Sequence, residues 1–397
     1  MLLVYCYNSH MSIFGNSGAK EELALVFDIG SSSVGVALFM TNTGAPKIIY
    51  SFREPIALED AINFDRFLAL TIKSLEVVAN KVCMQALGAP KKIYCVLASP
   101  WYASQTRTIR MEKNAPFIFT KKLADSLLEK EAALFEEEHL TGAGHKCRKI
   151  ELRSMRTALN GYVTQSPIGQ KASEAEITVF MSMSPEAVLQ KFEEAVGRHF
   201  HSKNVQFSSF VMAAFAVARD MFVSQESFLL VDIGGEVTDI SMVKKDMLRE
   251  SLSFPMGRNY MIRGLCESFS CSLDEAKSFI HLYKDAHADP ATEKKLSPII
   301  EKLRAEWLKK FQESLVNLSN DISIPATIFI TVDPQLADFF AETIKTEQFN
   351  QYTLTESKFR VVFLGTEALH GIATFEEKTI RDPFLIIEAI YINRFLK

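Results

Sequence analysis

The chain has 397 residues, of which 48% are hydrophobic and 23% charged, and its formal net charge is −4. This length exceeds one ordinary hydrophobic core, so two or more domains are expected. The charge balance gives no reason to expect nucleic acid as a partner. No apolar run approaches the roughly 20 residues that span a bilayer. The composition therefore predicts a multidomain globular protein.

The first 20 residues are expected to form a disordered tail, and the true start is either Met1 or Met11. The beginning of the chain is too short and polar for a secretory signal. The cysteines lack paired spacing, which is typical of reduced thiols in a cytoplasmic protein. They are Cys6, Cys83, Cys95, Cys147, Cys266 and Cys271. The pairs His145/Cys147 and His199/His201 are weak zinc candidates, because zinc needs four convergent ligands.

The first half of the chain alternates predicted strands and helices. Apolar runs predict strands over 23–27, 34–39, 48–52 and 93–98, with a helical stretch over 58–87. After the strand over 93–98, the pattern of predicted elements changes. A helix capped by Thr120 is expected through Leu140, then a strand over 177–180, then a helix that begins at Ser184-Pro185. We interpret residues 92–202 as a small α+β unit inserted into the first domain.

The second half begins with an apolar helix over 207–223. Further strands are expected over 228–231, 240–243, 247–254, 327–331 and 360–364, and helices over 260–318 and 335–346. Ser272 and Glu275 form a capping box in the longer helical region. Apolar residues surround the last helix, 384–397, which favours a buried core helix over a membrane anchor.

The motif Asp-Ile-Gly occurs twice, at Asp28–Gly30 and at Asp232–Gly234. Each copy ends an apolar run and precedes another strand, so each predicts a tight β-hairpin with an acid at the end of its first strand. Glycine lets the backbone approach a ligand closely, and backbone N–H groups can bind phosphate oxygens. Aspartate can hold a hydrated Mg²⁺. Two such hairpins predict two related lobes that grip one nucleotide.

These motifs resemble the actin-like ATPase superfamily, specifically its FtsA and PilM branch, over nearly everything from Leu23 to Lys397. Asp28-Ile-Gly-Ser-Ser-Ser-Val34 is similar to the first phosphate motif of this branch, and Val231-Asp-Ile-Gly-Gly-Glu-Val-Thr-Asp239 to the second. The insert, with Pro167-Ile-Gly169, resembles the FtsA subdomain called 1C or SHS2. The resemblance implies an α/β, actin-like (ribonuclease H-like) two-lobed fold with a small α+β SHS2-type insert.

The resemblance also implies a division into subdomains. The first lobe (1A) takes residues 21–91 and 203–227, with 366–397 returning to it. The insert takes 92–202. The second lobe (2A) takes 228–262 and 323–365, and a helical subdomain (2B) takes 263–322.

By the same resemblance, the cofactors are ATP and Mg²⁺. Asp28 and Asp232 would hold the metal through water. The phosphate-binding residues would be Gly30, Ser31, Ser32 and Ser33 on one side and Gly234, Gly235 and Thr238 on the other. No catalytic residue is identified, so the chain is either a slow Mg²⁺-dependent ATPase or not an enzyme.

Two departures from the family pattern argue against nucleotide binding. Glu236 stands where the second motif has its third glycine, and its charge would repel a phosphate unless the side chain points away. The adenosine motif should have a Gly-Gly pair after a late strand, but Asp333-Pro334 is found there.

Three functions remain open. The resemblance favours a self-associating scaffold at the cytoplasmic face of the inner membrane in cell division, as FtsA, with indirect membrane contact. The triple serine and the missing membrane tail favour a pilus-assembly role, as PilM. Glu236 and Asp333-Pro334 favour a nucleotide-free scaffold. A sugar kinase or chaperone ATPase shares the fold, but no motif supports either.

Overall fold

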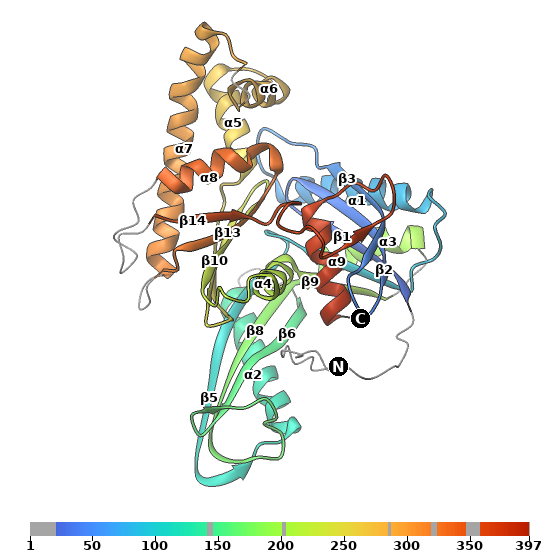
Figure 1. The fold of residues 1–397 in the computed structure, drawn as a ribbon, viewed down its shortest axis with the longest axis vertical. Helices are drawn as coiled ribbons and strands as arrows, with labels where there is room; N and C mark the ends of the chain where they lie inside the picture. Colours follow the sequence, from blue (N-terminus) through green and yellow to red (C-terminus); the bar gives the residue numbers. More distant parts are fainter. Residues whose placement is uncertain are drawn as a thin grey trace.

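The computed structural model describes residues 21–140, 146–200, 204–284, 287–318, 324–346 and 358–396. Strands in this part of the chain form sheets of six, five and four strands. Figure 1 shows the three sheets in separate parts of the molecule, with a group of helices at one end. The predictions for residues 1–20, and the two candidate zinc pairs through His145 and His201, lie outside the described residues.

The six-stranded sheet is the core of the first lobe, in the order β15-β3-β2-β1-β4-β9. Its strands are β1 (Glu22–Ile29), β2 (Ser33–Thr41), β3 (Lys47–Pro55), β4 (Lys92–Leu97), β9 (Val205–Ser209) and β15 (Thr374–Phe375). β4 pairs with β1 in parallel. Assigning residues 92–97 to the insert was therefore wrong: this strand is buried on both faces inside the first sheet, as parallel strands usually are.

Helices cover both faces of this sheet (Figure 1). α1 (Phe64–Cys83) and α3 (Glu186–Phe200) pack on one face, and α4 (Phe210–Met221) and α9 (Pro383–Phe395) on the other. α1 begins later than expected because Asn63 caps it, accepting a hydrogen bond from the Arg66 N–H at 3.1 Å. Residues 58–62 therefore lie outside the helix and can extend to the second lobe.

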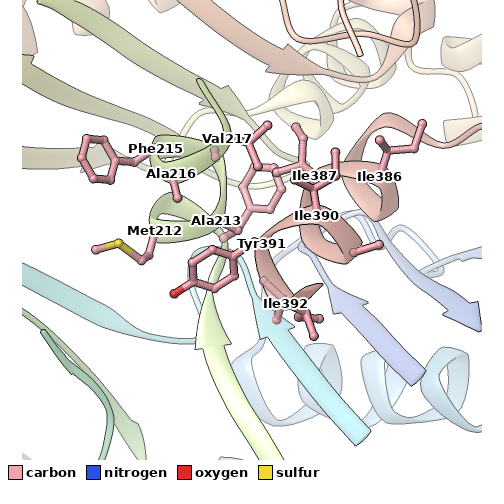
Figure 2. Packing of buried hydrophobic residues seen from close by; sticks show 14 of the residues in the cluster. Met212, Ala213, Phe215, Ala216, Val217, Ile386, Ile387, Ile390, Tyr391 and Ile392 are labelled. Atoms are coloured by element: carbon pink, nitrogen blue, oxygen red, sulfur yellow. The ribbon is translucent and has the colours of Figure 1, made fainter. Parts of the chain in front are cut away.

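The last helix lies in the core. Every residue of α9 from Leu385 to Asn393 is buried, and Figure 2 shows Ile387, Ile390 and Tyr391 beside the side chains of α4. The prediction of a buried core helix is confirmed. Within the described residues, no helix has the length and apolar character that crossing a bilayer would require.

The insert is a four-stranded antiparallel sheet in the order β5-β8-β6-β7, with α2 (Lys121–Leu140) packed on one face. Its strands are β5 (Ala103–Ile118), β6 (Cys147–Leu159), β7 (Tyr162–Val163) and β8 (Lys171–Pro185). β5 was not predicted. It is an edge strand whose side chains are half-buried or exposed, so it lacks the apolar run of a core strand.

A buried carboxylate joins the insert to the first lobe. Glu151 on β6 accepts hydrogen bonds from the hydroxyls of Ser208 at 2.7 Å and of Tyr391 at 2.9 Å. It also accepts from the backbone N–H of Ser209 at 3.1 Å and from the hydroxyl of Ser182 at 3.3 Å. One side chain therefore connects two strands of the insert with the start of α4 and with α9.

The five-stranded sheet forms the second lobe, in the order β12-β11-β10-β13-β14. Its strands are β10 (Phe228–Ile233), β11 (Thr238–Lys244), β12 (Met247–Phe254), β13 (Thr327–Val332) and β14 (Arg360–Phe363). Its helices are α5 (Arg258–Phe269), α6 (Leu273–Lys284), α7 (Pro290–Leu318) and α8 (Ala337–Thr346). The capping box at α6 is confirmed: the Ser272 N–H donates to the Glu275 carboxylate at 2.8 Å, and the Glu275 N–H donates to the Ser272 hydroxyl at 3.3 Å.

Candidate functional site

Both Asp-Ile-Gly turns face one cleft between the lobes. β1 and β2 form the first hairpin and β10 and β11 the second. The turns are built alike, because the Gly30 N–H donates to the Ser33 carbonyl at 3.2 Å and the Gly234 N–H to the Val237 carbonyl at 3.0 Å. The cleft has a volume of about 250 Å³, and its walls include the two acids Asp28 and Asp232.

The tips of the two turns touch each other. The Ser31 hydroxyl oxygen accepts hydrogen bonds from the backbone N–H of Gly235 at 2.9 Å and of Glu236 at 3.1 Å. A Cβ at Gly235 would lie 2.6 Å from the Ser31 carbonyl oxygen, so only glycine permits this contact. These two N–H groups are the kind that would cradle an anion. In this structure a serine of the opposite lobe occupies them.

The predicted phosphate-binding residues fall into two groups. Gly30, Ser31, Ser32, Ser33 and Gly234 line the cleft, whereas Gly235 and Thr238 do not.

Thr238 is fully buried on the other side of the second hairpin. Its hydroxyl donates to the Met256 carbonyl at 2.7 Å and accepts from the Trp307 indole N–H at 3.2 Å. Side chains alternate along β11, which turns Thr238 toward the helices and away from the cleft. The expectation that Thr238 binds phosphate is not met by this geometry.

Arg53, which the sequence did not indicate, pairs with Asp28. Its Nη2 lies 2.7 Å from Asp28 Oδ2, and its Nε lies 2.6 Å from Oδ2 of Asp382, the residue that caps α9. Its Nη1 also donates to the Ser33 hydroxyl at 3.0 Å. Burial disfavours the charged guanidinium, but Asp382 and Asp28 outweigh it and raise the pKa of Arg53.

A small residue makes room for Arg53. Gly35 on β2 lies opposite Arg53 on β3, and a Cβ at Gly35 would be 2.8 Å from Arg53 Nη2. The sequence did contain one signal for this ion pair. A glycine lies inside the strand that follows the first motif, and an arginine lies on the next strand.

Asp232 has no cationic partner among the described residues. Its Oδ1 accepts a hydrogen bond from the Thr331 hydroxyl at 2.7 Å. Burial, with a smaller contribution from Asp239, raises the pKa of Asp232 to about 8. Burial also raises the pKa of Asp239 to about 6, although Ser253 and Ser99 donate hydrogen bonds to it.

The two acids expected to hold Mg²⁺ do not fit a hydrated ion in this arrangement. The guanidinium group of Arg53 is paired with Asp28, so a cationic donor already occupies one oxygen of this carboxylate. Burial raises the pKa of Asp232 to about 8, so without a cation beside it this carboxyl favours its protonated form near neutral pH. Within the described residues, no group of three or more His, Cys, Asp or Glu side chains could hold a metal ion.

Glu236 points away from the cleft. Its two carboxylate oxygens accept hydrogen bonds from the guanidinium of Arg263 at 2.6 and 2.8 Å, and one also accepts from the Asn259 amide at 2.7 Å. Arg263 in turn donates from Nε to the Glu59 carbonyl of the first lobe at 2.8 Å. The residue in place of the third glycine therefore supports a link between the lobes, and its charge does not face the cleft.

The segment in place of the adenosine motif is filled by side chains. Asp333 follows β13 and forms an ion pair with Arg258, at the start of α5. Pro334 then begins a 3₁₀ turn, Pro334–Leu336. All of Arg258, Asp333 and Pro334 line the cleft.

The fold is that of the actin-like ATPases, which generally bind ATP and Mg²⁺. Residues 229–392 match the family model described as "Cell division protein FtsA". The match covers the second lobe, the helical subdomain and α9, but not the first hairpin or the insert. The resemblance of the chain to the FtsA and PilM branch and the expected fold class are confirmed.

Three solved structures resemble this chain to different degrees. The chain is 14% identical to a chain of the structure "PilM-PilN type IV pilus biogenesis complex", with a TM-score of 0.58, covering 93% of this chain and 96% of that one. The ethanolamine utilization protein EutJ from Carboxydothermus hydrogenoformans is 11% identical (TM-score 0.43, 96% and 92% covered). A MamK double helical filament is 11% identical (TM-score 0.45, 94% and 99% covered). A comparison with curated proteins found no match.

Proposed function

We propose that this chain is a scaffold protein whose closed arrangement of lobes is held by its own side chains and needs no nucleotide. The observation that carries the proposal is the contact between the two turns, in which Ser31 accepts the N–H groups of Gly235 and Glu236. Two ion pairs support the proposal, Arg53 with Asp28 and Arg263 with Glu236. In each pair a cation of the protein itself balances the charge of a buried carboxylate, so neither carboxylate needs a bound ligand to balance it.

The first candidate role for such a scaffold is that of FtsA in cell division, at the cytoplasmic face of the inner membrane. The match of residues 229–392 to the FtsA model supports this role. A pilus-assembly platform is the second candidate, because a PilM chain from a complex with PilN has a similar fold over 93% of this chain. Self-association and the binding of one division or pilus protein would be the activity.

Thermal unfolding with and without Mg·ATP tests the nucleotide-free proposal. A ligand at 100 times its dissociation constant stabilises the folded state by about 2.7 kcal/mol, which moves the melting temperature by several degrees. We expect no shift at millimolar Mg·ATP, either for the native chain or for the variant Asp28→Asn. A shift in the native chain that Asp28→Asn abolishes would refute the proposal and restore ATP and Mg²⁺ as cofactors.

Gene deletion in the source organism separates the two cellular roles. Loss of an FtsA-like protein should give filamentous, undivided cells, and loss of a PilM-like protein should give cells of normal length without pili. Complementation with Asp232→Asn should restore the normal phenotype in either case, because the proposed scaffold does not use the metal and Asp232 has no cationic partner among the described residues. Deleted cells that divide and make pili normally would contradict both roles.

A further inference from the structure

We propose that Cys266 and Cys271 form a redox modification site, at which exchange with a small-molecule disulfide creates a bridge between the end of α5 and the start of α6. The two helices contact each other in the group of helices at one end of the molecule (Figure 1). Neither thiol lines the interlobe cleft. The site is therefore independent of the function proposed above, and either can fail without the other.

The backbone of the turn between α5 and α6 brings the two cysteines together. α5 ends at Phe269, and Ser270 follows in the left-handed conformation with a φ of 49°. The Cys271 N–H donates to the Cys266 carbonyl at 3.1 Å. The Ser270 N–H donates to the Glu267 carbonyl at 3.4 Å. These two bonds define a Schellman motif, in which the side chains of the two residues joined by the longer-range bond frequently touch. Here both of these residues are cysteines.

The side chain of Cys266 points toward Cys271. Its Sγ lies 2.7 Å from the Cys271 carbonyl oxygen. With standard bond lengths, the hydrogen bond between the two backbones holds their Cα atoms no more than about 7 Å apart. Disulfides typically join Cα atoms that are about 4.4–6.8 Å apart. The bridge can therefore form by rotation of the side chains, with little movement of the backbone.

The residues after Cys271 are held in place as well. Ser272 and Glu275 cap the start of α6 in both directions, with bonds of 2.8 and 3.3 Å. Cys271 thus lies between the cap that ends one helix and the cap that begins the next. A disulfide at this position restricts the unfolded chain more than the folded one, so oxidation should favour the folded turn.

The exchange is balanced with oxidised glutathione as the oxidant. Cys266 and Cys271 are free, half-buried thiols, so a small molecule can reach them. One protein thiolate attacks oxidised glutathione, which forms a mixed disulfide and releases a glutathione thiolate. The other protein thiolate then attacks the protein sulfur of the mixed disulfide and releases the second glutathione. Two protein thiols are oxidised, and one glutathione disulfide is reduced to two thiols.

The rate of this exchange should depend on pH. Burial, and then the neighbouring Cys266, raise the pKa of the Cys271 thiol. Only the thiolate reacts, so the exchange should be slow at neutral pH and should become faster as the pH rises. Reduced thiols are thus the ordinary state of the pair, and the bridge is the response to an oxidising environment.

Peptide mapping of the full chain tests the site. Trypsin cuts after Arg263 and after Lys277, so both cysteines fall in the one peptide 264–277. After treatment with oxidised glutathione and then an alkylating reagent, we expect this peptide to lack two hydrogen atoms and to carry no alkyl group. Cys83, which is exposed and lies on α1, is the internal control. It should be alkylated or joined to glutathione.

Variants separate the pair from the other thiols. Cys266→Ser and Cys271→Ser should each abolish the bridge and leave the remaining cysteine of the peptide open to alkylation or to glutathione. The matched control Cys83→Ser should form the bridge as the native chain does. Melting temperatures check that each variant is folded.

Two further measurements test whether the folded turn promotes the bridge. In glutathione redox buffers, the equilibrium constant for its formation should be at least about tenfold larger in the native chain than in the chain unfolded in urea, because the turn already holds the thiols together. Hydrogen exchange of α6 amides should be slower in the oxidised chain, whereas exchange in α3 should not change.

Three results would overturn the proposal. The first is a 264–277 peptide that carries an alkyl group or glutathione on both cysteines under conditions in which Cys83 has reacted with glutathione. The second is a bridge that forms no more readily in the folded chain than in the unfolded one. The third is hydrogen exchange in α6 that is the same in the reduced and the oxidised chain.

Discussion

Replacing Glu236 should destabilise the protein strongly, although a glycine is expected at this position in the family pattern. The Glu236 side chain is only 8% exposed and accepts three hydrogen bonds, two from Arg263 and one from Asn259. Removing one partner of a buried ion pair costs about 3–5 kcal/mol, because the other charge stays buried without compensation. Arg263 is 20% exposed and keeps its hydrogen bond to the Glu59 carbonyl. The cost of Glu236→Ala in free energy of unfolding should therefore lie at the lower end of this range, about 3 kcal/mol.

Urea unfolding of the native chain and four variants gives the free energy of unfolding directly. Glu236→Gln keeps one acceptor oxygen and should lose about half as much as Glu236→Ala. The double variant Glu236→Leu with Arg263→Met replaces both charges by apolar groups and should be less destabilised than Glu236→Ala. Glu377→Ala removes an exposed glutamate and is the matched control. If Glu236→Ala unfolds within about 0.5 kcal/mol of this control, the ion pair does not hold the lobes and the reasoning is wrong.

Three further predictions concern the cleft. Ser31→Ala leaves two backbone N–H groups of the second turn without an acceptor and should lower the free energy of unfolding by about 1–3 kcal/mol in thermal melts, whereas Ser32→Ala should not. Because burial raises the pKa of Asp232 from 3.8 to about 8, the folded chain retains a proton that the unfolded chain releases. Stability from this group is present below about pH 4 and is lost as the pH rises to about 8, by up to about 1.4 kcal/mol per unit. Asp232→Asn should flatten that pH dependence in urea unfolding, and an unchanged slope would contradict it. Burial and then Asp28 hold the pKa of Glu388 well above its usual range, and the carboxyl group of Asp28, which is already paired with Arg53, is the hydrogen-bonding neighbour of this buried side chain. Glu388→Leu should therefore raise the free energy of unfolding by about 1 kcal/mol, and a loss would show that the carboxyl is satisfied.

The hairpins could be predicted because their signals are local. An apolar run, an acid, a glycine turn and a second run lie within about a dozen residues at both Asp28 and Asp232, and both pairings are found. α9 could be predicted as a core helix for the same reason, since its apolar residues surround the whole helix.

Contacts between distant residues could not be predicted. Arg53 meets Asp382 across 329 positions, and no spacing rule connects a strand near the start of the chain with a helix cap near its end. The direction of Glu236 depended on Arg263 and Asn259, which lie on a helix that begins after two more strands. β4 looked like the first strand of the insert because a buried strand carries no mark of the sheet to which it belongs.

The carboxylate of Glu151 has a consequence for how this protein can be cut apart. A version shortened by excising residues 103–185 would remove the common acceptor of the hydroxyls of Ser208, Ser209 and Tyr391. It would also remove Phe180, which packs in the same hydrophobic core as α4 and α9, and so expose part of that core to water. The four-stranded unit is therefore part of the packing of the first lobe and not a detachable accessory.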